Sequence, residues 1–165
     1  MMYRFKYKTL DNFDDIIMES DGEYLTGLWF ENSTDDKKHN EKFEKKELEI
    51  FNTVTKWLDM YFSHKKPFFD VNYKILKASD FQRMVWDILL NIPYGCTITY
   101  GEIAKIVAKQ RGISKMSPQA VGHAVGSNPL CLIIPCHRVI GINGNLVGYG
   151  GGIKNKEQLL LLEQI

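Results

Sequence analysis

Residues 130–139 read Leu-Cys-Leu-Ile-Ile-Pro-Cys-His-Arg-Val, and this stretch says most about how the chain folds. Its first half is an uninterrupted apolar run, which predicts a short buried strand over residues 130–134. Pro135 ends that strand, because proline has no N–H to donate to a central ladder. Cys136 therefore begins a turn at the edge of the core, and an imidazole is its next neighbour in the chain.

The thiol of Cys136 and the imidazole of His137 together indicate nucleophilic chemistry. Apolar surroundings raise the pKa of a thiol above its free value of about 8.5, so a reactive Cys136 needs a base nearby. Histidine, with an ordinary pKa of about 6.5, is the usual base, and His137 is the nearest candidate. Neighbours in an extended segment point to opposite sides, so we expect a water to bridge the two side chains.

The three cysteines favour a reducing compartment. Cys96, Cys131 and Cys136 are odd in number and form no Cys-x-x-Cys pair, which predicts a cytoplasmic protein. A metal site at Cys131, Cys136 and His137 lacks the second cluster that a tetrahedral set needs, so we predict no bound metal. The first residues form no apolar leader, and no apolar run reaches the ~20 residues of a membrane span.

The bulk properties allow a real core and say little about partners. The chain has 165 residues, of which 44% are hydrophobic, enough for one large or two small domains. Its net charge of +1 by itself says nothing about nucleic acid. Acidic residues outnumber basic ones in residues 1–78, and the reverse holds in residues 79–165. The second half is therefore the better candidate for the half that faces a partner, and a solvated basic face would produce the same asymmetry.

The first half is predicted to be a small antiparallel sheet with one helix packed on it. Short alternating or apolar segments separated by turns indicate the strands, and a long run at helical spacing indicates the helix. A linker then separates a domain of residues 1–76 from one of residues 77–165. The predicted elements are strands at 3–8, 16–18, 24–30 and 68–71, and a helix from Glu41 to Ser63.

The second half changes to short helices. Ser79 or Asp80 caps a first helix that extends to residue 90, and a second helix covers about residues 102–109. Ser117 followed by proline is a strong start signal for a third helix at 119–127, which is rich in Ala and Gly. Two short helices joined by a turn resemble a helix-turn-helix, and the bare third helix suits close approach to a partner or tight helix packing.

A series of short motifs runs through residues 79–165. In chain order they are Phe81-Gln82-Arg83-Met84-Val85-Trp86, Ile92-Pro93-Tyr94-Gly95, Thr99-Tyr100-Gly101-Glu102-Ile103-Ala104, Ala120-Val121-Gly122, Asn128-Pro129, Pro135 to Val139, Gly148-Tyr149 and Leu159 to Glu163. Together they resemble the 6-O-alkylguanine-DNA alkyltransferases, also called methylated-DNA-protein-cysteine methyltransferases. The first half shows only a pattern compatible with that family's variable N-terminal domain.

The resemblance implies an α+β fold: a small N-terminal α/β domain, an antiparallel sheet plus a helix, before a mainly helical domain with a winged-helix-like helix-turn-helix. It also implies a single-use DNA repair enzyme that acts as a monomer and needs no cofactor. Such a protein binds duplex DNA, rotates 6-O-alkylguanine or 4-O-alkylthymine out of the stack, and moves the alkyl group irreversibly to its own cysteine. Cys136 matches that acceptor, which relatives that only flag lesions lack.

The resemblance assigns further residues to the site. His137 matches the base that acts through water, Glu163 the carboxylate that orients the imidazole, and Asn128 the hinge before the active-site strand. Without the resemblance, Glu163 would pass for a solvated acid at a helix end and Asn128 for a helix stop. The other matches are Tyr100 for the hydroxyl that assists the leaving base, Tyr149, Val139, Gly150 and Lys156 for the base pocket, and Gln119, Ala120, Gly122 and Arg138 for DNA binding, with Arg138 also tying down the active-site loop.

One position departs from the family pattern. Gln119 begins Gln-Ala-Val-Gly where the family usually has Arg-Ala-Val-Gly, with the arginine inserted in place of the extruded base. Glutamine fills that gap and hydrogen-bonds the orphaned base, but it brings no charge. We therefore predict weaker or more sequence-sensitive DNA binding, with phosphate contacts from Lys109, Arg111 and Lys115 in compensation. Cys131 is interpreted as packing, not as a second acceptor.

Two other functions stay open at this point. A Cys-His peptidase or thioesterase needs a histidine that is remote in sequence and faces the sulfur, together with an oxyanion hole, and the adjacency of His137 argues against it. A non-catalytic winged-helix regulator that binds DNA needs no thiol chemistry. It predicts binding to DNA without loss of the Cys136 thiol.

Overall fold

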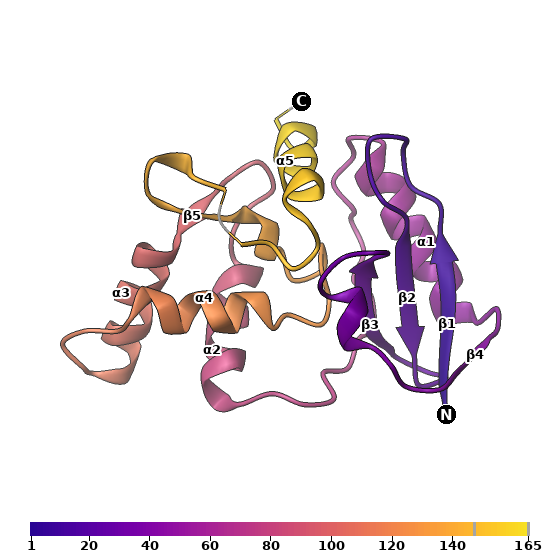
Figure 1. The fold of residues 1–165 in the computed structure, drawn as a ribbon, viewed down its shortest axis with the longest axis horizontal. Helices are drawn as coiled ribbons and strands as arrows, with labels where there is room; N and C mark the ends of the chain where they lie inside the picture. The colour runs from indigo at the N-terminus through magenta and orange to yellow at the C-terminus, as the bar shows by residue number, and fades with distance from the viewer. Residues whose placement is uncertain (147, 165) are drawn as a thin grey trace.

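The computed structural model describes residues 1–146 and 148–164 and has an α+β fold in two parts (Figure 1). A small sheet with one helix forms the N-terminal part, and a group of helices forms the C-terminal part. This arrangement confirms the predicted fold class. Within the described ranges, no helix is both long enough and apolar enough to cross a membrane.

The N-terminal part is a four-stranded sheet with a helix on one face (Figure 1). Its elements are β1 (Met2–Tyr7), β2 (Ile16–Ser20), β3 (Leu25–Phe30), β4 (Phe43–Lys45) and α1 (Glu49–Phe62). The strand order is β3-β2-β1-β4, antiparallel except for the parallel pair of β1 and β4. Alternation along β1 turns Phe5 toward α1, where it stacks on Phe51 with ring centroids 6.0 Å apart.

Two predictions for this part are wrong. The helix predicted from Glu41 begins at Glu49, because Phe43–Lys45 pairs with β1 as a strand. The predicted strand at 68–71 does not form. The edge of β3 that a further strand would need is instead paired, through Leu25, with Tyr73.

The C-terminal part begins with three capped helices. Ser79 and Thr99 each form a capping box with the third helical residue, and the Ser117 side chain caps the third helix. The start signals at Ser79 and Ser117 are therefore confirmed. The elements of this part are α2 (Asp80–Leu90), β5 (Ile98–Thr99), α3 (Tyr100–Arg111), α4 (Pro118–Gly126), β6 (Val139–Ile140) and α5 (Ile153–Leu162), with the 3-10 turns η2 (Cys136–Arg138) and η3 (Ile142–Gly144). A further 3-10 turn, η1 (Asp36–Lys38), lies between β3 and β4 in the N-terminal part.

Helices α3 and α4 form the helix-turn-helix, and α2 packs against both. The indole N–H of Trp86 on α2 donates to the carbonyl of Ala124 on α4 at 2.8 Å, inside the core. Val85, Ile103 and Val121, one from each helix, are fully buried around this contact region. Trp86 therefore fixes the position of α4 through one directed bond as well as through apolar packing.

The strand predicted at 130–134 is a buried turn, so that prediction is wrong. Only Leu130 pairs, in a single bridge with Leu28 of β3. Leu132 has a φ of +68°, a left-handed conformation that leaves the extended path. The N–H of Ile134 then bonds back to the carbonyl of Leu130 at 3.0 Å. The run is apolar because the turn lies in the core, not because it forms a ladder.

The edge strand β3 joins the two parts of the chain. The N–H of Leu28 donates to the carbonyl of Pro129 at 2.9 Å, and the N–H of Cys131 donates to the carbonyl of Leu28 at 3.0 Å. The segment between α1 and α2 binds the same edge, where Leu25 pairs with Tyr73. The predicted domain boundary lies in that segment and stays a prediction.

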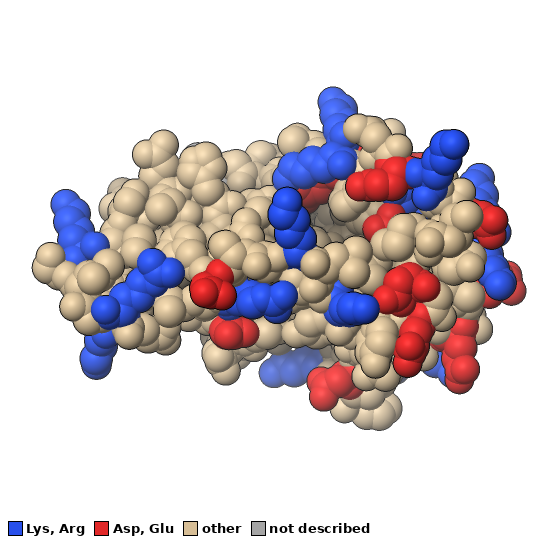
Figure 2. All heavy atoms as spheres, turned by 90° about the horizontal axis from the view of Figure 1, so that it is seen from below, with Lys and Arg blue, Asp and Glu red and all other residues tan. Residues whose placement is uncertain are grey.

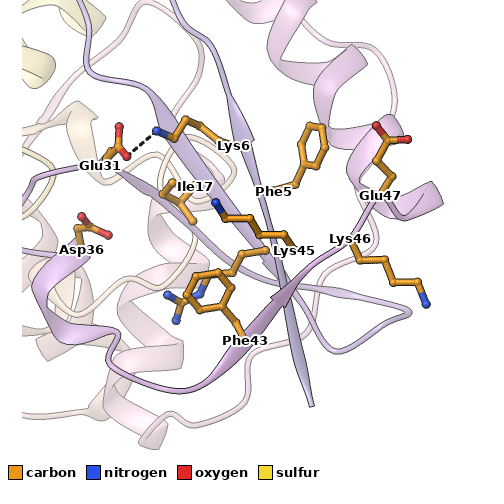
Figure 3. Close-up of a pocket in the computed structure, with 10 residues that line it drawn as sticks. Phe5, Lys6, Ile17, Glu31, Asp36, Phe43, Lys45, Lys46 and Glu47 are labelled. Atoms are coloured by element: carbon orange, nitrogen blue, oxygen red, sulfur yellow. Dashed lines mark ion pairs between the residues drawn. The ribbon is translucent and has the colours of Figure 1, made fainter.

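The surface differs between the two parts. On the face in Figure 2, acidic side chains gather over the N-terminal part, and basic side chains mark the far end of the helical part. A hollow of about 590 Å³ lies on the N-terminal sheet, with Phe5, Ile17 and Phe43 among lysine and acidic side chains (Figure 3). None of its lining residues belongs to the C-terminal part, so it is separate from Cys136.

The bond between Trp86 and α4 yields a stability prediction. Trp86→Phe leaves the Ala124 carbonyl without its donor and removes ring volume, so we expect the free energy of unfolding to fall by about 2–4 kcal/mol. Urea unfolding followed by circular dichroism measures this change. Trp57→Phe, at a half-buried position on α1, is the control and should cost less. Equal losses in the two variants would contradict the assigned role of the indole N–H.

Candidate active site and DNA interface

Cys136 lies in η2 and lines a small hollow at the end of α4. Only 7% of the residue is exposed. The hollow has a volume of about 10 Å³, so its walls close around the thiol. Those walls come from both parts of the chain and include Asp35, Tyr100, Val125, Asn128, Tyr149 and Gly150.

The thiol of Cys136 is a poor acid in this setting. Burial is the main reason that its pKa rises to about 11, and the carboxylate of Asp35 adds to the rise. Hydrogen bonding with Asn128 and the positive charge of Lys156 act in the opposite direction. The thiol is therefore protonated at neutral pH, and a reaction through sulfur requires a base.

Asn128 holds the turn that carries Cys136. Its Nδ2 donates to the carbonyl of Ile134 at 2.8 Å, and its Oδ1 accepts the N–H of Leu130 at 2.9 Å. One buried amide thus ties both ends of the apolar turn to the end of α4. A change in the position of α4 would be transmitted to the thiol through this side chain.

His137 follows Cys136 in η2 and is fully buried. Its Nε2 lies 2.5 Å from Oε2 of Glu163. Because a carboxylate only accepts, Nε2 carries the proton, and Nδ1 keeps its lone pair. Nδ1 has no hydrogen-bond partner among the described residues. The imidazole thus has the tautomer of a general base, and the bridging water stays a prediction.

Glu163 follows α5 and is buried, with 1% of its side chain exposed. Besides His137, its carboxylate accepts the Tyr61 hydroxyl at 2.5 Å, Nε and Nη2 of Arg138 at 2.8 and 3.1 Å, and the N–H of Gly95 at 3.2 Å. Burial alone would raise the pKa of Glu163, but these donors outweigh it and hold the pKa far below its usual range. Glu163 is therefore a carboxylate, not the solvated helix-end acid that the isolated sequence suggests.

Lys156 on α5 forms the back of the site. It is 1% exposed, and its ammonium donates to the carbonyl of Val139 at 2.5 Å. The same ammonium lies 5.8 Å from the ring centre of Tyr149. Burial lowers the pKa of Lys156, whereas the thiol of Cys136 raises it. Lys156 thus supplies positive charge beside the sulfur.

The front of the site is formed by two tyrosines and a tight backbone contact. Tyr100, half-buried, begins α3. The Tyr149 hydroxyl is buried and makes no hydrogen bond of standard geometry with the described residues, although it is close enough to lower the pKa of Cys136. The carbonyl of Gly150 accepts the N–H of Asp35 at 2.9 Å, and a Cβ on Gly150 would lie 2.3 Å from Oδ1 of Asp35.

The exposed side of α4 adjoins this site. Gln119 is exposed, Ala120 is half-buried, and the Cβ position of Gly122 lies 3.8 Å from the ring of Tyr100. An open hollow of about 440 Å³ joins Tyr100, Gln119, Gly122 and His123. Three residues predicted for the site, Tyr100, Gln119 and Gly122, therefore share one surface beside the thiol. The cations named for phosphate contact, Lys109, Arg111 and Lys115, are all exposed.

The structure does not place Arg138 with this surface. Its guanidinium bonds to both oxygens of Glu163, and its Nη1 donates to the carbonyl of Ile92 at 2.8 Å. Only 11% of the side chain is exposed. Each guanidinium nitrogen donates one bond inside the protein, which fits the predicted tie on the active-site loop, and the predicted DNA contact of Arg138 stays a prediction.

Two site residues escaped the sequence analysis, and both come from the N-terminal part. Tyr61 on α1 has the apolar spacing of a core residue, so its hydroxyl gave no signal. Asp35 lies in a polar loop with ordinary turn composition. Its ammonium partner Lys38, 2.9 Å away, also donates to the carbonyl of Gly126 at 3.3 Å, which brings that loop onto the end of α4.

Comparison with known proteins gives consistent matches. A family model described as 6-O-methylguanine DNA methyltransferase, DNA binding domain, matches residues 80–165. The methylated-DNA--protein-cysteine methyltransferase of Mycobacterium tuberculosis (strain ATCC 25618 / H37Rv) is 46% identical over 114 residues, which is 69% of this chain and 66% of that protein. The matched segment thus spans just under two thirds of that relative. The Methanosarcina acetivorans protein of the same name is 44% identical over 115 residues, 70% of each chain.

Solved structures extend the likeness to the whole chain. Mycobacterium tuberculosis OGT in complex with DNA matches with a TM-score of 0.79 at 36% identity, covering 99% of this chain and 92% of that one. A Pyrococcus kodakaraensis enzyme shares the fold, with a TM-score of 0.70 at 23% identity. A helix-turn-helix beside a buried Cys-His-Glu arrangement defines a class, the helix-turn-helix proteins with a buried thiol site. Within it, the chain belongs to the 6-O-methylguanine DNA methyltransferase family, which confirms the resemblance found in the sequence.

The depressed pKa of Glu163 predicts how stability responds to acid. In the unfolded chain a glutamate titrates at about 4.3, so the folded carboxylate adds stability above that pH and loses it as the pH falls toward the folded pKa. Glu163→Gln should lower the free energy of unfolding at pH 7 by about 3–5 kcal/mol, because Arg138 stays buried without its partner. It should also weaken the decline of stability between about pH 5 and pH 3.

Urea unfolding at a series of pH values measures both effects. Glu157→Gln, at an exposed position on the same helix, is the matched control and should change stability by less than about 0.5 kcal/mol. A Glu163→Gln variant as stable as the control at pH 7 would show that the buried carboxylate is not a structural centre.

Proposed function

We propose that this chain repairs DNA by moving a methyl or larger alkyl group from 6-O-alkylguanine, and from 4-O-alkylthymine, in duplex DNA to its own Cys136. The transfer is irreversible, so each molecule acts once. The observation that carries the proposal is the unpartnered Nδ1 of buried His137, held by Glu163 next to a buried thiol at the end of the helix-turn-helix. The names of the family and of the curated relatives support it.

The reaction follows from the acid-base properties of the site. With a thiol pKa of about 11, only about one molecule in ten thousand carries a thiolate at pH 7. His137 removes the proton through a bridging water, and Glu163 stabilises the imidazolium that results. The sulfur attacks the alkyl carbon, the carbon–oxygen bond breaks, and its electron pair stays on the base. The base then takes up one proton, with Tyr100 placed to assist it, and the imidazolium gives up the proton that came from the thiol, so atoms and charge balance.

The closed hollow sets a requirement for binding. Its volume of about 10 Å³ is about what one water molecule needs, so a base fits only after the walls move apart. We assign the wall residues Tyr149 and Gly150, together with Val139 and Lys156 near the hollow, to the rotated base. A buried alkylated oxygen is unreachable inside the duplex, so the base must leave the stack, and Gln119 on α4 takes its place. Ala120 and Gly122 let the helix backbone approach the DNA.

Two further features belong to the proposal. Cys96, Cys131 and Cys136 are all free, which suits the reducing cytoplasm, and we place the protein there as a monomer. Cys131 is fully buried, and burial raises its pKa well above the ordinary value, so it packs in the core and accepts no alkyl group. A thiol hydrolase is not favoured, because neither ring nitrogen of His137 bonds to the sulfur of Cys136: Nε2 faces Glu163, and Nδ1 has no hydrogen-bond partner among the described residues.

Intact-mass measurement tests the transfer directly. Mixing the protein with a duplex that contains 6-O-methylguanine should add one methyl group, located on Cys136 by peptide mapping. Cys136→Ala should gain nothing, and Cys131→Ala should gain the methyl group as the wild type does. A wild-type mass that stays unchanged after DNA binding would overturn the proposal and leave the non-catalytic regulator.

The uncharged residue on α4 yields a binding prediction. Gln119→Arg should tighten binding to duplex DNA about 5–10-fold and steepen the salt dependence by about one released counterion, because a cation is added at the DNA face. Fluorescence anisotropy at several salt concentrations measures both quantities. Gln164→Arg adds the same charge beyond α5 and should change the DNA affinity and its salt dependence little. Equal effects of the two variants would contradict the position assigned to Gln119.

A further inference from the structure

Tyr61 brings a hydroxyl from the N-terminal part into the Cys-His-Glu site. It lies in the last turn of α1 and is 1% exposed. Its hydroxyl donates to Oε2 of Glu163 at 2.5 Å and lies 3.5 Å from Nε2 of His137. The reaction described above uses no group from Tyr61, so this contact calls for its own explanation.

We propose, on the basis of the function proposed above, that Tyr61 is a positioning residue for alkyl transfer. Its hydroxyl shares Oε2 of Glu163 with His137 and thereby keeps the imidazole aimed and neutral, ready to take the thiol proton. Tyr61 touches neither the sulfur nor the base to be repaired. It acts through Glu163.

The geometry supports this role because Tyr61 and His137 share one acceptor atom. Oε2 receives both the Tyr61 hydroxyl and Nε2 of His137, each at 2.5 Å. Every additional donor to a carboxylate stabilises its charge and makes it a weaker base. A weaker Glu163 pulls less on the imidazole proton, so it favours the imidazolium less. Without the hydroxyl, Glu163 would hold a charged His137 more tightly before any substrate arrived.

Tyr61 is able to donate over the whole working pH range. Burial and the neighbouring Glu163 raise the pKa of its hydroxyl well above the ordinary value of 10. The ring is fixed by aromatic neighbours: it stacks on Trp57 at 5.7 Å and meets Tyr94 edge-on at 5.9 Å between ring centres. The hydroxyl therefore stays protonated and stays in place.

The other groups around His137 act in identifiable directions. Burial lowers the pKa of His137, Glu163 raises it, and the cations Arg138 and Lys156 lower it. Tyr94, in the segment after α2, faces Glu163, and His64, just beyond α1, contacts the carbonyl of Leu162 through Nδ1 at 3.2 Å. Among these groups, Tyr61 is the uncharged one that donates to Oε2 of Glu163, the oxygen that also binds the imidazole of His137.

The pH dependence of single-turnover methyl transfer tests this role in the full-length chain. Tyr61→Phe keeps the ring and removes only the hydroxyl. The acid limb of the pH–rate profile of this variant reports protonation of the base and should move up by about one pH unit. At a pH well below both midpoints the rate constant should therefore fall about tenfold, whereas at pH 8.5 it should stay within about twofold of the wild type. Tyr7→Phe is the matched control, since Tyr7 donates at 2.7 Å to Asp59 on the same helix but not to Glu163.

A purely structural role for Tyr61 would lower the rate equally at all pH values or change only the free energy of unfolding. An acid limb of Tyr61→Phe that coincides with the wild type, or that shifts equally in Tyr7→Phe, would overturn the proposal. Titration of His137 by nitrogen-15 NMR gives a readout that needs neither methyl transfer nor a stable variant. The wild-type imidazole should titrate below about 6.5 despite its carboxylate partner, and a higher midpoint would overturn the proposal.

These measurements separate the two proposals. A wild-type protein that transfers no methyl group would refute the repair function while the His137 titrations still report on Tyr61. Normal transfer with unchanged His137 titration in Tyr61→Phe would refute the role of Tyr61 alone.

Discussion

A buried negative charge that must be fully hydrogen-bonded organises this structure. Removing a carboxylate from water costs several kcal/mol unless donors replace the solvent. Glu163 meets that requirement with four donor residues from three places: Tyr61 on α1, Gly95 after α2, and His137 and Arg138 in η2. Satisfying one group thus fixes the positions of the sheet domain, the helical domain and the turn that carries the thiol. The Tyr61 bond makes the N-terminal part a component of the site.

The same constraint determines how the Cys136 thiol is protected and how it is activated. Because Nε2 of His137 faces Glu163, only Nδ1 is left to act as a base. Cys136 has a pKa raised to about 11, the opposite of a cysteine that is reactive at rest. A buried, protonated thiol resists oxidation, since oxidants attack the exposed thiolate. For a proposed acceptor that is used once, this protection matters more than speed, and reactivity is switched on only through the base.

The sequence predicted much of the C-terminal part because its signals are local. Caps at Ser79 and Ser117 set the starts of two helices. The short motifs indicated the family and identified Cys136 and His137 as site residues. Long-range pairings left no such signal. The parallel pairing of Phe43–Lys45 with β1 replaced a predicted helical turn, and the single bridge of Leu130 to Leu28 replaced a predicted strand. An apolar run reports burial, and burial alone does not distinguish a strand from a turn.

The N-terminal half also forms part of the wall around the thiol. The loop at η1 places the Asp35 carboxylate against Gly150, where no side chain would fit, and Lys38 ties the same loop to the end of α4. Asp35 opposes thiolate formation, whereas Tyr61 supports the base that produces it. The two residues come from different elements of one sheet domain, docked to the helical domain along β3. A complete site therefore exists only when β3, α1 and the turn after α4 have assembled, although the groups that would react all lie in the C-terminal half.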